Sequence, residues 1–152
     1  MILEPSFKDF LSLLNKHKVE YLVIGGYAVA IHGYVRGTSD MDIWVNPTSE
    51  NADKMLTVML DFGFGEYDFD IKDFLITSKS GFVSIGEIPF KIEILTKTLG
   101  VTFEEAYPHR KTASIDDIMV NFIGLDDLIA NKKAVAREKD LNDIANLMDL
   151  NE

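Results

Sequence analysis

The feature that most constrains this chain is a β-type run that leads directly into a glycine pair and then into a helical segment. Residues 19–24 favour a strand, Gly25 and Gly26 follow at once, and residues 27–34 have a helical pattern. This order leaves backbone N–H groups free at the start of the helix, and the glycines let a phosphate approach the main chain closely. A tight turn that needs positive φ is the alternative interpretation of the same pair.

Fifteen positions after the first glycine, the stretch Asp-Met-Asp-Ile-Trp-Val at residues 40–45 predicts a second strand. Side chains alternate between the two faces of a strand, so Asp40 and Asp42 point the same way while the apolar residues between them face the other. Two like charges side by side repel, and a divalent cation such as Mg²⁺ relieves that repulsion by binding carboxylate and phosphate oxygens. A solvated edge strand is the alternative.

The remaining pattern predicts several further helices and strands. Helices are expected over residues 5–17, from residue 48 or 49 onward, and over 102–107, 125–133 and 138–150. Strands are expected over residues 82–85 and 90–95, with two edge strands over 112–115 and 119–122. The final helix is expected to bury Leu141, Ile144, Ala145 and Met148. Because this order lacks regular βαβ alternation, it predicts one α+β domain over residues 1–152, with a mixed, mostly antiparallel sheet flanked by helices.

Composition and charge exclude several classes of protein. The formal net charge of -10 argues against a broad, salt-driven contact with nucleic acid, which needs clustered Lys and Arg. The absence of cysteine excludes disulfides and thiolate metal sites. No apolar run approaches the roughly 18 residues that span a bilayer, and the charged N-terminus is unlike a signal peptide. We therefore expect a cytoplasmic protein.

A third carboxylate interrupts a later strand. Glu93 lies within the apolar run of residues 90–95, where burial without a partner would be costly. Two-metal phosphoryl-transfer sites use such an acid from a neighbouring strand, which makes Glu93 a candidate metal ligand. A cross-strand ion pair with a lysine is the alternative, and Glu87 is a weaker substitute because Gly86 and Pro89 place it in a turn.

Three other side chains are candidates for contact with phosphate. Arg36 offers a planar, bidentate donor, or it is a surface arginine or a partner that neutralises the two aspartates. Thr38 can cap the backbone or bind phosphate oxygens. Lys132 continues the apolar face of the penultimate helix, so it either extends outward to solvent or points at an anion in a cleft.

The sequence predicts a simpler role for the positive residues that follow Lys132. Lys133, Arg137 and Lys139 are expected on a solvated face, with Asp140 and Asp143 as local ion-pair partners.

Taken together, these residues resemble the nucleotidyltransferase superfamily, which includes DNA polymerase beta and small antibiotic nucleotidyltransferases. That resemblance rests on the glycine pair, the acidic strand and the later acid. The closer similarity is to the group with the abortive-infection nucleotidyltransferase toxins, whose pattern is matched by Gly25-Gly26-Tyr27-Ala28, Arg36-Gly37-Thr38, Asp40-Met41-Asp42 and the later set Lys132, Arg137, Asp140 and Asp143. It extends from Tyr21 to about Leu147, and departs from the common pattern at Gly26, often serine, and at Glu93, usually aspartate.

The resemblance implies a Mg²⁺-dependent transfer of a nucleoside monophosphate from an NTP, with ATP as the default, to a hydroxyl of RNA, a protein or a small molecule. Asp40, Asp42 and Glu93 would hold two Mg²⁺ ions. Gly25, Gly26, Arg36, Thr38 and Lys132 would contact the nucleotide. A toxin–antitoxin or phage-defence role with a cognate partner protein is also implied. The departures at Gly26 and Glu93 motivate an alternative, a weakly active or inactive protein that acts as a regulatory or antitoxin-type binding partner.

Overall fold

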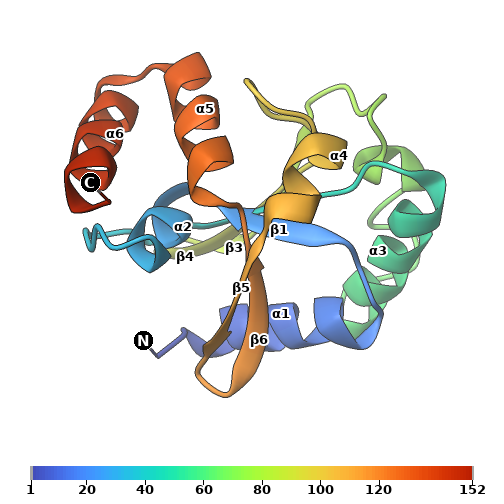
Figure 1. Cartoon of the computed structure of the whole chain (residues 1–152). Coiled ribbons are helices and arrows are strands. Elements are labelled where there is room, and N and C mark those ends of the chain that lie inside the picture. The colour runs from blue at the N-terminus through green and yellow to red at the C-terminus, as the bar shows by residue number, and fades with distance from the viewer. Residues whose placement is uncertain (1, 152) are drawn as a thin grey trace.

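The computed structural model of the protein describes residues 2–151 and contains one mixed sheet with helices on both faces (Figure 1). The elements follow in the order α1 (Pro5–Lys16), β1 (Tyr21–Ile24), α2 (Gly25–Ile31), β2 (Met41–Val45), α3 (Ser49–Asp61), the 3-10 turn η1 (Ile71–Phe74), β3 (Phe82–Glu87), β4 (Phe90–Leu95), α4 (Phe103–Ala106), the 3-10 turn η2 (Tyr107–His109), β5 (Lys111–Ile115), β6 (Ile118–Phe122), α5 (Leu125–Val135) and α6 (Glu138–Leu150). In this view α1 lies below the sheet, and α5 and α6 lie above it. The predicted α+β class is confirmed.

The six strands have the order β3-β4-β2-β1-β6-β5. The pairs β1–β2, β3–β4 and β5–β6 are antiparallel, whereas β1–β6 and β2–β4 are parallel. The prediction of a mixed, mostly antiparallel sheet is therefore confirmed. The expectation that both late strands lie at an edge is wrong for β6. Its parallel pairing with β1, about 100 residues away in the sequence, places it inside the sheet.

Apolar periodicity places α1 correctly. A side chain every three or four residues lies on one helix face, and the fully buried positions of α1 are Phe7, Phe10, Leu11 and Leu14. Phe7 and Phe10 also make edge-to-face contacts with the rings of Tyr27 and Phe62. The layer beneath the sheet is thus a conventional hydrophobic core.

The last helix departs from its apolar pattern. Its buried residues are Asp140, Asp143, Ile144 and Leu147, whereas Leu141 and Met148 are about half exposed. The expected buried stripe is therefore wrong, apart from Ile144. Two aspartates occupy the inward face because cations from other segments neutralise them there, as described below.

Within residues 2–151, no helix is long and apolar enough to cross a membrane.

Candidate functional site

A cavity of about 530 Å³ brings together most of the predicted site residues. It lies where the glycine pair, the loop before β2 and the start of α6 meet, and it is lined by Gly25, Gly26, Arg36, Gly37, Thr38, Ser39, Asp40, Asp42, Lys132, Arg137 and Lys139. Every predicted site residue except Glu93 lies on its wall. The lining thus combines the carboxylates Asp40 and Asp42 with four cations, three of them from the C-terminal half of the chain.

The two glycines allow close contact between the start of α2 and the acidic strand. Gly25 has a φ of 67°, in the left-handed region, and a Cβ there would overlap the carboxylate of Asp42. A Cβ on Gly26 would lie 2.5 Å from the hydroxyl oxygen of Thr38. The main chain of α2 therefore begins directly against two predicted site side chains. This packing, together with the positive φ at Gly25, requires glycine at both positions.

The acids lie on adjacent parallel strands. Asp42 of β2 is in register with Glu93 of β4 on one side and with Ile24 of β1 on the other, and Asp40 immediately precedes β2. Burial, followed by the charges of Glu93 and Asp40, raises the pKa of Asp42 from 3.8 to about 6. Neither Asp40 nor Asp42 forms an ion pair within residues 2–151. Negative charge is therefore concentrated here without neutralising contacts.

The three acids do not form a closed metal cage. In the part of the chain that the structure describes, no group of three or more His, Cys, Asp or Glu side chains is arranged to hold a metal ion by itself. Mg²⁺ commonly binds to only one or two carboxylates and takes its other ligands from water and substrate phosphates. An open pair of acids beside a phosphate-sized cavity is compatible with that mode of binding.

Lys132 is buried and engaged with two carboxylates. Its Nζ lies 3.0 Å from Asp140 Oδ1 and 2.9 Å from Asp143 Oδ2, and only about 5% of its side chain is exposed. The sequence predicts either extension of this side chain to solvent or its contact with an anion. The structure shows a lysine that lines the cavity while its charge is neutralised from α6.

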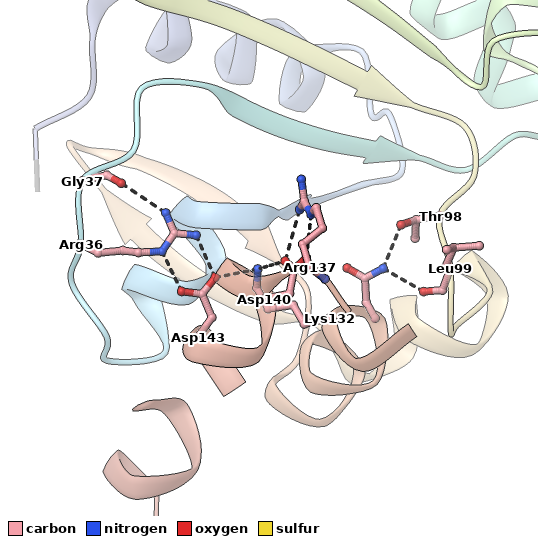
Figure 2. Close-up of polar contacts among 9 residues, drawn as sticks. Arg36, Gly37, Thr98, Leu99, Lys132, Arg137, Asp140 and Asp143 are labelled. Carbon is pink, nitrogen blue, oxygen red and sulfur yellow. Dashed lines mark hydrogen bonds and ion pairs between the residues drawn. The ribbon is translucent and has the colours of Figure 1, made fainter. Parts of the chain in front are cut away.

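Arg36 and Arg137 complete the same network (Figure 2). The guanidinium of Arg36 donates two hydrogen bonds of 2.8 Å to Asp143, and the Nε of Arg137 donates one of 2.7 Å to Asp140. Burial opposes ionisation of both aspartates, but the hydrogen bonds from these cations outweigh it. They hold the pKa of Asp140 at about 2 and also lower the pKa of Asp143.

Arg137 and Lys139 are exposed, as the sequence predicts, but they have a further role that was not predicted from their positions in the helix. Both line the cavity, and their charges lower the pKa of Asp42. A signal for this placement was present in the sequence, because Asp140, Asp143, Ile144 and Leu147 have the spacing of one helix face. With those aspartates turned inward, the residues just before them are brought to the cavity.

Comparison of the sequence with models of known protein families and with curated proteins finds no match. Solved structures do match. The chain is 16% identical to the lincosamide antibiotic adenylyltransferase LnuA, solved with lincomycin bound, with a TM-score of 0.58 and 97% of each chain covered. A candidate nucleotidyltransferase from Thermotoga maritima is also 16% identical, with a TM-score of 0.56 over 99% of this chain and 93% of that one.

A third match is an antigenic nucleotidyltransferase-like protein from Paracoccidioides brasiliensis, 15% identical with a TM-score of 0.59 over 95% of this chain and 75% of that one. The chain has the nucleotidyltransferase fold. At these identities the likeness concerns the fold, so the activity has to be argued from the residues of the cavity.

Proposed function

We propose that this protein is a nucleotidyltransferase that transfers a nucleoside monophosphate from an NTP to an acceptor hydroxyl. One observation carries the proposal: Asp40 and Asp42, which have no ion-pair partner among the described residues, share a cavity lining with four cations, and Glu93 lies beside Asp42 on the neighbouring strand. An arrangement of this kind suits a ligand that brings both cations and anions. A metal–triphosphate complex is such a ligand.

Charge balance supports the participation of Mg²⁺. Arg36, Lys132, Arg137 and Lys139 are the cations of the cavity wall. They are opposed by five carboxylates in and beside the cavity, Asp40, Asp42, Glu93, Asp140 and Asp143. With every acid ionised, the site is slightly negative and would repel a free triphosphate. Two divalent cations would reverse that sign.

Mg²⁺ would be held by Asp40, Asp42 and Glu93, as expected from the sequence. Once bound, it would supply neutralisation of the phosphate oxygens and of the charge that develops on the leaving group. Ionised Asp42 is disfavoured by burial and by its acidic neighbours, so a cation beside it relieves an existing electrostatic cost.

Other residues of the cavity would position the triphosphate. Gly25 and Gly26 begin α2, so their backbone N–H groups have no acceptor within the helix and would be donors to phosphate, and the Thr38 hydroxyl lies where a side chain at position 26 would be. Thr38 therefore offers a hydroxyl close to the place where related sequences carry serine. Arg137 and Lys139 would add positive charge from the start of α6.

The transfer itself needs little covalent chemistry from the protein. The acceptor oxygen would form a bond to the α-phosphorus as the bond to the β-phosphate oxygen breaks, and pyrophosphate would leave. The hydroxyl proton would pass to a carboxylate, for which Glu93 is the candidate beside Asp42. Catalysis would then come from orientation and electrostatic stabilisation.

The identity of the acceptor is the finer part of the proposal. RNA, a protein hydroxyl and a small molecule are all compatible with the cavity. Lincomycin is bound in LnuA, which matches this chain over 97% of both lengths. That match supports testing small hydroxylated molecules first. A toxin–antitoxin or phage-defence context would instead favour RNA or a protein.

The direct test is incubation with each of the four α-labelled NTPs, Mg²⁺ and acceptors of the three classes. We expect Mg²⁺-dependent label transfer from at least one NTP, and loss of transfer in Asp42→Asn. The matched control is Asp149→Asn, which makes the same change at an exposed position of α6. Absence of transfer from every NTP, with equal metal and NTP binding by wild type and Asp42→Asn, would refute the proposal.

A second candidate function is a binding partner that keeps the fold without efficient transfer. The observation that favours it is Lys132, whose charge is already neutralised by Asp140 and Asp143. The net charge of -10 fits a basic protein partner such as a cognate toxin or antitoxin. Purification from the native host distinguishes the two functions: stoichiometric recovery of a partner without label transfer supports this candidate.

A further inference from the structure

The inward face of α6 is built around two buried carboxylates. The side chains of Asp140 and Asp143 are each only about 1% exposed. They face the body of the protein, while Leu141 and Met148 of the same helix are exposed to 53% and 48%. Ile144 and Leu147 are buried on the same face, but their burial alone does not explain why two aspartates lie there while Leu141 and Met148 are exposed. The orientation of α6 therefore also depends on the groups that neutralise the aspartates.

Three separate segments supply the neutralising cations (Figure 2). Arg36 comes from the loop between α2 and β2, Lys132 from α5, and Arg137 from the residue just before α6. Asp143 receives Arg36 and Lys132, and Asp140 receives Lys132 and Arg137. Lys132 thus bridges the two carboxylates. The network forms a continuous connection from the loop before β2, through α6, to α5.

The connected segments are also the ones that line the nucleotide cavity. The loop that carries Arg36 continues into Thr38 and Asp40, and the start of α6 carries Arg137 and Lys139. Charged groups removed from water need partners, and the loss of one partner leaves the others uncompensated. The positions of the cavity residues are therefore linked to the integrity of the network.

We propose that Asp143 is a positioning residue, which acts through Arg36 and Lys132 to hold the loop before β2 against α6, so that Arg137 and Lys139 face the triphosphate. The proposal rests on the proposed function for the identity of that ligand. In this arrangement Lys132 supports the cavity through the carboxylates, whereas Arg137, whose side chain is 58% exposed, is available to the ligand.

The variant Asp143→Asn gives a test in which simple electrostatics and loss of positioning predict opposite changes in the affinity for the triphosphate. Removal of a negative charge beside the cavity would by itself strengthen triphosphate binding. Loss of positioning would weaken it. We expect Mg²⁺–ATP, or whichever NTP wild type binds, to bind about tenfold more weakly, within the usual range for coupled sites. Unchanged or tighter binding, in a folded protein, would overturn the proposal.

The variant Arg36→Gln tests the connection independently, and it leaves the Lys132–Asp143 pair in place. If Arg36 acts through Asp143, the double variant with Asp143→Asn binds NTP about as weakly as the weaker single variant, because both changes break one connection. If Arg36 contacts phosphate itself, the losses from the two changes add, which contradicts the proposal. Asp149→Asn is the control, since it removes a charge from an exposed position of α6.

Amide hydrogen exchange of the nucleotide-free protein separates this proposal from the proposed function. We expect at least about tenfold faster exchange in residues 33–40 and 137–143 of Arg36→Gln, as in local opening, with wild-type exchange in α1. That result supports the positioning role even if no NTP is ever bound. Exchange identical to wild type in both segments would overturn it.

Discussion

The protein has two clusters of carboxylates in and beside the cavity, and the clusters differ in their ion pairing and in their pKa values. Asp40, Asp42 and Glu93 have no ion-pair partners within residues 2–151, and the pKa of Asp42 is raised to about 6. Asp140 and Asp143 are more deeply buried, yet cations surround them and the pKa of Asp140 is held at about 2. The second cluster is internally neutralised and suits an architectural role. The first cluster is not neutralised, which suits a site whose balancing charge arrives with a ligand.

The largest contrast is expected from Asp42→Asn. Loss of a carboxylate that organises the reacting phosphate should lower kcat/KM about a thousandfold, or about 4 kcal/mol in barrier height. The metal-free protein should nevertheless be as stable as wild type or more stable, because the change removes a disfavoured charge. Steady-state kinetics and chemical denaturation in EDTA measure the two effects. A clear loss of stability would show that Asp42 is needed by the fold itself.

Asp140→Asn should behave in the opposite way. It leaves Lys132 and Arg137 without a buried counter-charge, so the free energy of unfolding should fall by about 3 kcal/mol. Urea denaturation measures this loss, and exposed Asp149→Asn, expected within about 0.5 kcal/mol of wild type, is the control. Equal stability of the two variants would remove the distinction between the clusters.

Smaller effects are expected from the glycines that press α2 against the acidic strand. Gly26→Ala places a Cβ 2.5 Å from the hydroxyl oxygen of Thr38 and should cost about 1–2 kcal/mol of stability. In a Thr38→Ala background the same change should cost less, because the opposing side chain is shortened. Denaturation of the four members of this cycle measures the coupling. Strictly additive losses of stability would show that contact with Thr38 is not the cause of the destabilisation by Gly26→Ala.

A final contrast is expected in the dependence of stability on pH. The raised pKa of Asp42 means that its favourable contribution is present below about pH 4 and is lost as pH rises through about 6. The lowered pKa of Asp140 means that its contribution is present above about pH 4 and is lost as pH falls through about 2. Stability differences between wild type and each Asn variant, measured in EDTA across pH 2–8, should change in these separate windows. If both stability differences changed over the same pH range, the electrostatic distinction between the two clusters would be contradicted.

Much of the fold and of the acidic cluster is predictable from local sequence. Three short-range signals each mark an element that the structure contains. They are the β-type run that ends at Gly25, the alternation of acidic and apolar residues around Asp42, and the apolar stripe of α1. The prediction that Asp40, Asp42 and Glu93 bind metal stays a prediction. Their placement on adjacent strands follows from the parallel pairing of β2 with β4.

The second cluster was not predictable in the same way. The spacing of Asp140 and Asp143 with Ile144 and Leu147 indicates a shared helix face, but hydrophobic periodicity contains no information on the partners that allow two aspartates to be buried there. One partner, Arg36, lies 107 residues from Asp143 in the sequence. This long-range pair is one of the contacts that neutralise the inward face of α6, and local sequence patterns do not reveal it. The interior position of β6 was missed for the same reason.

The most direct measurement is calorimetric titration of wild type and Asp42→Asn with a non-hydrolysable ATP analogue, and then with the other three NTP analogues, in the presence and absence of Mg²⁺. Wild type should bind at least one analogue only when Mg²⁺ is present, and Asp42→Asn should bind it at least about tenfold more weakly, a loss of about 1.4 kcal/mol. Binding that is equally tight without Mg²⁺, or equally tight in the two proteins, would contradict the assignment of the uncompensated carboxylates to a metal–triphosphate site.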